Sequence, residues 1–178
     1  MVLRGAVLAG ALVFLLTSMA CGSPKAVEEV ERPLLRTESE GFQLQDAGDG
    51  WMTVQIPYVY LNESSDTVYL AGCDDGTPPS LQRHEYGEWV VRWSPFVFGC
   101  LGPPVVVLPG FEYRDTLVVH AGEFGSNNAP QFGVSDIDGT YRLLLTSAFT
   151  SYFADGPPWG PEVPLRRRVS NSFELRAP

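Results

Sequence analysis

The chain has 178 residues, of which 44% are hydrophobic, enough apolar material for one domain with a single core. Its 12 basic residues against 21 acidic residues give a net charge of -9, and no basic stripe interrupts this balance, so nucleic acid is not an expected partner. The 18 glycines and 15 prolines favour short strands and many turns over helices, which predicts an all-β protein.

The first residues have the features of an export signal. Arg4 supplies a positive charge, an apolar run covers residues 5–16, and small or flexible residues precede Cys21. The run is too short to span a bilayer comfortably, so it predicts a signal peptide over residues 1–20 and an exported protein.

Ser18 and Ala20 occupy the two small-residue positions before the predicted cleavage site, and Cys21 follows directly. This segment resembles the lipobox of bacterial lipoproteins, in which the cysteine after the cleavage site receives diacylglycerol and becomes the new N-terminus. The resemblance implies that Cys21 anchors the protein to the cell envelope, and Gly22 is similar to the pattern for the outer membrane, if the organism has one. Ser18 departs from the usual leucine, and the alternative is plain secretion with Cys21 as an odd thiol.

Residues 21–40 are rich in charge and contain Pro24 and Pro33, with little apolar surface to bury. This composition predicts a disordered tether between the anchor and the folded domain. A short helix over residues 27–35 is the alternative, which Pro33 and the crowded charges disfavour.

From residue 41 to residue 178, apolar runs alternate with turn residues, without a long stretch of helical periodicity. Pro57 implies an edge or a bulge in its strand, and Gly87 with Glu88 predicts the turn of a tight hairpin. About eight or nine strands fit two packed sheets better than a closed barrel. The expected strands cover residues 42–45, 51–61, 68–73, 81–86, 89–93, 105–108, 111–120, 140–147 and 169–176.

Cys73 and Cys100 bracket the predicted hairpin that carries Trp89 and Trp93. Two cysteines around tryptophans, with strand-like runs on both sides, predict a disulfide buried between two sheets. Lipidation of Cys21 would leave the other two cysteines as an even pair. Closing a loop of this length stabilises a fold by about 3 to 4 kcal/mol in an oxidising compartment.

Several turn and strand residues follow one another in a characteristic order. They are Asn62, Gly87, Trp89, Pro109, Gly110, Gly139, Tyr141, Arg142, Asn171 and Phe173. Over residues 51–175 this order resembles a family of bacterial immunoglobulin-like domains found in secreted and lipid-anchored proteins, which implies a two-sheet immunoglobulin-like sandwich and no catalytic residue. The two cysteines and the insertion between residues 147 and 169 are not part of that pattern, so function does not follow from the fold.

Enzymatic and metal sites are not expected. His84 and His120 lie in different predicted strands without ligand partners at metal-binding spacing. The acidic turns at Asp74 and Asp138 begin like calcium loops but lack the later ligands, and Asp and Gly favour β-turns by themselves. No serine lies in a Gly-x-Ser-x-Gly elbow. We therefore expect no catalytic residue, no metal and no cofactor.

Residues 149–168 are the expected binding segment. Rigid aromatic rings on a loop stiffened by prolines, next to arginines, have the composition of a contact surface. The alternative is that the rings fold back over the sandwich and that the arginines pair with acidic groups. The candidate residues are Tyr152, Phe153, Trp159, Arg166 and Arg167, with Arg168 following them.

Together these features predict a non-enzymatic, lipid-anchored envelope protein with an immunoglobulin-like interaction or structural module. The alternative is an inhibitor or ligand-binding protein that presents residues 149–164 to an extracellular enzyme or polymer. Besides the membrane, the expected partner is an envelope or extracellular protein.

Overall fold

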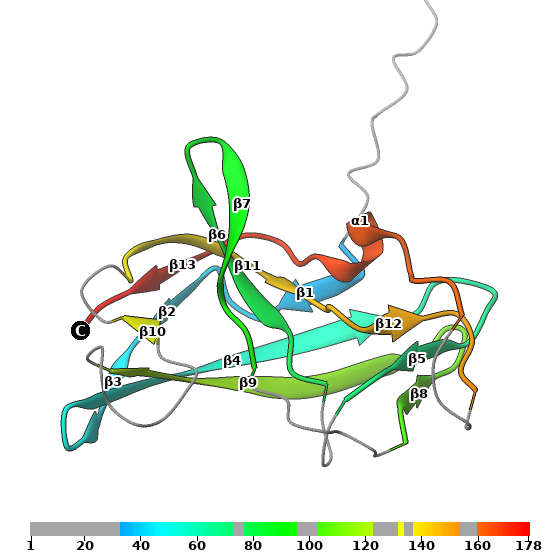
Figure 1. Cartoon of the computed structure of the whole chain (residues 1–178), viewed down its shortest axis with the longest axis horizontal. Coiled ribbons are helices and arrows are strands. Elements are labelled where there is room, and N and C mark those ends of the chain that lie inside the picture. The colour runs from blue at the N-terminus through cyan, green and yellow to red at the C-terminus, as the bar shows by residue number, and fades with distance from the viewer. Residues whose placement is uncertain (1–32, 73–76, 96–102, 123–131, 134–136, 154–159) are drawn as a thin grey trace, which may run out of the picture. The chain divides into compact units, whose positions relative to one another are not determined.

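The computed structural model describes residues 33–72, 77–95, 103–122, 132–133, 137–153 and 160–178 (Figure 1). Strands predominate in these residues, and the helix among them is the single turn α1 (Leu165–Arg168), which confirms the all-β prediction. The predicted signal peptide, the lipidation site Cys21, the disulfide between Cys73 and Cys100, and Trp159 all lie outside the described residues.

Sheet A is built on two long strands. β4 (Trp51–Leu61) pairs antiparallel with β9 (Glu112–Gly122) over nearly its whole length. β1 (Leu35–Thr37) and β3 (Gln45–Gly48) lie along the other edge of β4, and β10 (Phe132–Gly133) runs parallel to the end of β9. The strong apolar and polar alternation of β4 explains why the sequence predicted this strand with its correct bounds.

Sheet B has the strand order β2-β13-β11-β6-β7. Its neighbours are antiparallel except for β2, which runs parallel to β13. The strands are β2 (Gly41–Gln43), β6 (Ser80–Glu85), β7 (Glu88–Trp93), β11 (Gly139–Leu144) and β13 (Phe173–Arg176).

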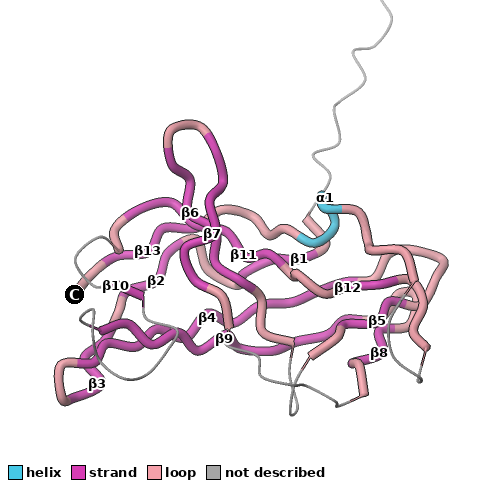
Figure 2. Tube along the Cα trace, in the orientation of Figure 1, coloured by secondary structure: helices cyan, strands magenta, loops and turns pink. Residues whose placement is uncertain are grey.

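Sheet C is small and contains β12 (Ala148–Phe149), β5 (Val68–Leu70) and β8 (Val105–Val107), in the order β12-β5-β8. β8 and β9 follow each other across Gly110, whose φ of 78° suits glycine, yet they belong to different sheets. The tube view shows these three short strands together at one side of the folded unit (Figure 2).

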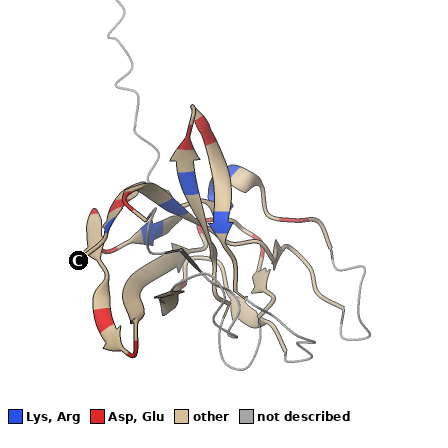
Figure 3. Ribbon diagram, turned by 60° about the vertical axis from the view of Figure 1, so that its left-hand side comes forward, with Lys and Arg blue, Asp and Glu red and all other residues tan. Residues whose placement is uncertain are grey.

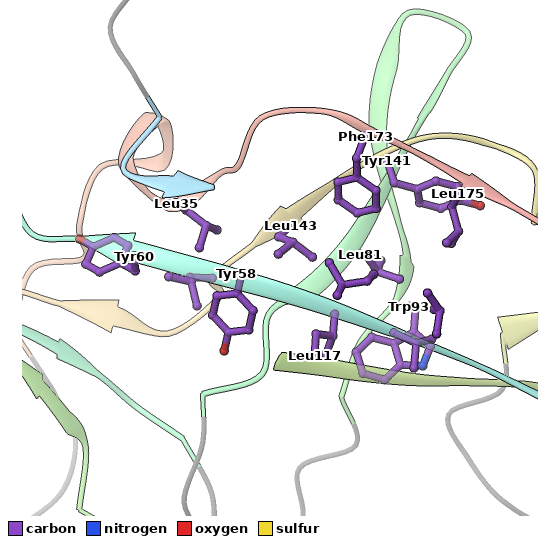
Figure 4. Close-up of a cluster of buried hydrophobic side chains, with 14 of the residues drawn as sticks. Leu35, Tyr58, Tyr60, Leu81, Trp93, Leu117, Tyr141, Leu143, Phe173 and Leu175 are labelled. Atoms are coloured by element: carbon purple, nitrogen blue, oxygen red, sulfur yellow. The ribbon is translucent and has the colours of Figure 1, made fainter. Parts of the chain in front are cut away.

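Sheets A and B face each other across one core (Figure 4). Sheet A contributes alternate residues of β4 and β9, such as Tyr58 and Leu117, and sheet B contributes residues such as Leu81, Leu143 and Phe173. Two sheets that are apolar on their inner faces are stable only when those faces cover one another. Trp93 reaches this core from the end of β7.

The first part of the folded chain alternates between the two sheets. β1 lies in sheet A, β2 in sheet B and β3 again in sheet A, so this short segment connects the two layers. Leu35 in β1 is fully buried, and Leu44 between β2 and β3 is buried as well.

The predicted tether over residues 21–40 is therefore wrong at its C-terminal end. The compact unit begins at Arg32, and Leu34 and Leu35 are part of the core. Of the charged residues in this segment that the structure describes, Glu38 and Glu40 are exposed, and Arg36 pairs with Glu112 at 2.8 Å. The charge density of a segment does not show whether its few apolar residues can be buried by pairing with a strand elsewhere in the chain.

Pro57 lies at a free stretch of edge, as expected. On the side of β4 away from β9, the pairing with β3 ends at Thr53 and the pairing with β1 begins at Tyr58. The Glu38 N–H donates to the Pro57 carbonyl at 3.4 Å, so Pro57 directs its backbone toward this gap. A proline there removes no hydrogen bond from the ladder.

The hairpin of β6 and β7 confirms the expected tight turn, displaced by one residue. Glu85 pairs with Glu88, so the turn residues are Tyr86 and Gly87 rather than Gly87 and Glu88. Both have positive φ, 50° and 89°, which is the pattern of a type I′ turn. The hairpin projects from the sandwich (Figures 1 and 2).

Candidate interaction surface

The outer face of sheet C carries apolar side chains that the fold does not bury. Val68, Leu70 and Val107 point into the core, and the alternate residues Tyr69 and Val106 lie opposite each other on the other face. Val106 is 52% exposed, and Leu108, two residues further along the same face, is also exposed. The outer face of sheet C therefore exposes apolar side chains of the kind that protein–protein interfaces bury.

The 149–164 segment is fastened next to this face by its own hydrogen bonds. The Thr150 N–H donates to the Pro161 carbonyl at 2.9 Å, and the Gly160 N–H donates to the Ser151 carbonyl at 3.1 Å. A Cβ at Gly160 would lie 1.7 Å from the Ser151 hydroxyl oxygen, so only glycine allows the two backbones to approach this closely. Residues 152–159 thus connect two chain segments, 150–151 and 160–161, that are hydrogen-bonded to each other. We call these two segments the paired base.

The paired base places Tyr152 on sheet C. Its ring stacks on that of Tyr69, with centroids 6.0 Å apart and an interplanar angle of 24°. Phe153, the next residue, is exposed. We call Tyr69, Val106, Leu108, Tyr152 and Phe153 the sheet C surface. The sequence pointed to the last two through their composition, but the other three become visible only when β5 and β8 pair.

The arginines after this segment have different environments. Arg168 is fixed by the fold: its Nε donates to the Val163 carbonyl at 2.7 Å, its Nη1 to the Leu145 carbonyl at 3.1 Å, and its Nη2 to the Glu162 carboxylate at 2.7 Å. Arg167 is half-buried, and Arg166 is exposed. Arg168 therefore holds α1 against the end of β11, whereas Arg166 is available to solvent.

The β6–β7 hairpin is a second exposed feature. Its outer face carries a stack in which the Arg142 guanidinium lies 4.3 Å from the centre of the Trp89 ring and the His84 ring lies 5.0 Å from the same tryptophan. Partial burial beneath the hairpin lowers the pKa of Arg142. Acidic residues lie toward the tip and basic residues nearer the base (Figure 3). His84 is thus a packing residue of this stack.

Tyr86 at the tip is an unusual residue for its conformation. Its φ is 50°, and its side chain is 105% exposed, so no packing compensates for the left-handed backbone. We expect Tyr86→Asn to raise the free energy of unfolding by about 1 kcal/mol, because Asn tolerates the first position of a type I′ turn.

Urea denaturation of the full chain measures this effect. Glu63→Gln serves as the control, since it changes an exposed acidic residue outside the hairpin and should shift stability by less than about 0.5 kcal/mol. A Tyr86→Asn chain no more stable than the parent would show that the turn is not strained.

A partly buried polar cluster surrounds the Asp115 carboxyl group. The single hydroxyl proton of Tyr58 is shared between the Thr77 carbonyl oxygen and Asp115 Oδ2, both at 3.1 Å, and Tyr113 donates to Asp115 Oδ2 at 2.8 Å. Asp115 Oδ1 accepts the Thr116 N–H at 2.7 Å. Because these contacts satisfy both carboxyl oxygens, the cluster acts as a structural link between β4, β9 and the chain before β6.

Burial raises the pKa of Tyr58, Tyr60 and Tyr113, so these phenols keep their protons in the folded protein when the unfolded chain loses them. The contribution of these phenols to stability is therefore expected to be constant below the ordinary phenol pKa of about 10 and to be lost as the pH rises above it. The midpoints of urea unfolding at about pH 8 and about pH 11 measure how steeply the free energy of unfolding falls with pH. Tyr58→Phe should flatten this fall, and an equally steep fall in that variant would exclude Tyr58 as a cause.

Within the described part of the chain, no group of three His, Cys, Asp or Glu side chains could hold a metal ion. The same residues contain no helix with the length and apolar character to cross a membrane. Comparisons with protein-family models, with curated proteins and with solved structures found no match to this chain.

Proposed function

We propose that this chain is an exported, lipid-anchored envelope protein whose immunoglobulin-like module binds a protein partner and carries out no catalysis. The observation that carries the proposal is the sheet C surface, where Tyr69 and Tyr152 stack beside the exposed Val106. Clustered apolar and aromatic side chains that a fold leaves in solvent are typical of interaction sites.

The strand pairing supports an immunoglobulin-like module. In that fold one sheet contains the strands A, B and E, and the other contains G, F and C, with C′ added in variable-type domains. The order β1-β4-β9 matches the first set, and β13-β11-β6-β7 matches the second, in the same chain order. β5, β8 and β12 form an addition to this plan, and they are the strands that carry the sheet C surface.

The export signal and the lipobox resemblance support the anchor. Cys21 lies eleven residues before Arg32, where the compact unit begins, so a short connection would separate the lipid from the module. The module would then work close to the membrane surface rather than at the end of a long tether.

An inhibitor is the second candidate, and the base of the 149–164 segment favours it. An inhibitory loop binds an enzyme more tightly when the rest of the protein already holds the loop in its bound conformation, because less conformational entropy is lost on binding. The close contact between Gly160 and Ser151 would provide such a support.

The binding proposal is tested in the native envelope with the full chain. A photo-reactive phenylalanine analogue at Val106 should form a discrete adduct with another protein. The matched control is the same analogue at Val118, which is 43% exposed on β9 and belongs to sheet A instead of sheet C. Equal labelling from both positions, or none from Val106, would contradict the proposed surface.

The anchor is tested separately by cell fractionation. Cys21→Ala should release the chain from the membrane fraction, whereas Cys73→Ala should leave it there. Retention of the Cys21→Ala chain would rule out this anchor without affecting the binding proposal.

A further inference from the structure

β7 is the last strand of sheet B, and among the described residues its outer edge has no strand partner. Because Glu85 and Glu88 flank a two-residue turn, they form a hydrogen-bonded pair, and the alternation of such pairs leaves Trp89 and Val91 with their backbone groups directed outward. β7 contains neither lysine nor proline, residues that commonly protect an edge.

The side chains of this edge are unusually apolar. Val90 is 36% and Val91 47% exposed, and both belong to β7, a strand of the hairpin that projects from the sandwich (Figures 1 and 2). An open edge with exposed β-branched residues is a site for the addition of another strand.

We infer that β7 pairs antiparallel, edge to edge, with β7 of a second copy of this chain, around a twofold axis at Val90. In this register Val90 faces Val90 of the second copy, Trp89 faces Val91, and Glu88 faces Arg92. Two sheets B would join into one continuous sheet across the axis, as a symmetric interface requires.

Complementarity along the strand points to a second copy. An antiparallel strand that pairs with itself must place complementary residues at equal distances on both sides of the axis, and Glu88 and Arg92 meet this condition. Trp89 opposite Val91 is a favourable aromatic and β-branched pair. An axis at Val91 instead would place Arg92 against Val90, and an axis at Trp89 would place Glu88 against Val90, so neither pairs the charges.

Arg92 can take part although it already binds Glu85 within its own hairpin. A guanidinium group has five N–H donors, so it can contact a second carboxylate. The bulge between Leu81 and Gln82 leaves Arg92 as the extra residue of β7 and ends the regular edge there. The net charge of -9 on each copy opposes association in general, which makes a local match between opposite charges necessary.

A symmetric disulfide tests the register in the full chain in its envelope. Val90 of the two copies would form a non-hydrogen-bonded pair, whose Cα atoms lie about 4.5 Å apart, within the range that a disulfide spans. Val90→Cys should therefore give a reducible dimer under mild oxidation. Val118→Cys, which has a similar exposure and the same native cysteines, should remain monomeric. Dimer formation no greater than in this control, or an adduct with a different protein instead of a dimer, would overturn the proposal.

Charge reversal provides the second test. Each charge variant also carries Val90→Cys, and the two variants carry different tags, so that a cross-link between unlike chains can be recognised. Glu88→Arg places Arg against Arg on both sides of the axis, and Arg92→Glu places Glu against Glu, so each should reduce cross-linking about tenfold or more. Mixing the two variants restores an Arg–Glu pair at both positions and should restore the cross-link between the different tags.

Mixed chains that cross-link no better than either variant alone would contradict this register. Arg92→Glu also removes the contact with Glu85, so thermal unfolding must show that the variant folds. If it does not, Glu88→Arg decides alone, and undiminished cross-linking in that chain overturns the proposal. The binding of another protein at Val106 is unaffected by either result, which keeps this inference separate from the sheet C surface.

Discussion

Replacing Leu35 by Ala is expected to lower the free energy of unfolding by about 3 kcal/mol, because the side chain is fully buried and its loss leaves a cavity between the sheets. Leu35 lies in β1 opposite Tyr60 of β4. β1 has three residues, so few other contacts can compensate for the loss.

Urea denaturation of the full chain measures the change, and Leu165→Ala is the matched control. Leu165 lies in α1 with an exposed side chain, and its truncation should change stability by less than about 0.5 kcal/mol. Equal stabilities of the two variants would mean that β1 does not belong to the folded unit and that the tether extends to residue 40 after all.

Replacing Asn62 by Ala is expected to cost a similar amount, about 3 kcal/mol, through hydrogen bonds instead of packing. The buried Asn62 amide donates to the carbonyl groups of Asp66 and Val107, both at 2.8 Å, and its Oδ1 accepts the Ser64 N–H at 3.1 Å. Truncation leaves the Val107 carbonyl in the interior without this donor. Because Val107 belongs to β8, the loss should also loosen sheet C.

Ser64→Ala is the control for this substitution, since it removes a partner of Asn62 Oδ1 and leaves both amide donors in place. It should cost about 1 kcal/mol, the usual value of a single hydrogen bond. Hydrogen exchange would separate the two effects: Asn62→Ala should increase exchange in β5 and β8 more than in β4 and β9. Equal costs for both substitutions would show that the amide donors contribute little.

The sequence predicted best those elements whose signal is local. Neighbouring residues alone reveal the alternate apolar positions of β4. They also reveal the β6–β7 hairpin, in which two strand-like runs flank a turn that contains glycine. Tyr86 was not recognised as a turn residue because tyrosine seldom adopts a positive φ. β1 was missed because its three residues lie in a charged segment, and their burial depends on β4, which follows them in the chain.

The sequence could predict less of the candidate surface, because a surface depends on which strands become neighbours. Tyr152 and Phe153 stand out by composition on a loop rich in proline and glycine. Val106 does not, since the run around it is uniformly apolar and only the pairing of β8 with β5 decides which side chains face solvent. The division into three sheets is similarly a matter of non-local pairing, which periodicity does not encode.

The passage of the N-terminal chain from sheet A to sheet B and back has a mechanical consequence. If the protein is held by its N-terminus while a partner pulls on the module, the load first meets the pairing of β1 with β4, beginning where the Leu61 N–H donates to the Leu34 carbonyl at 2.8 Å. At the end of β1 it meets Thr37, whose N–H and hydroxyl oxygen are both bonded to the Asn171 side chain at 3.0 Å. Beyond that point the force divides between β4 and β13, because β1 and β2 belong to opposite layers. Under such a load the N-terminal end of the module would resist separation of the two sheets.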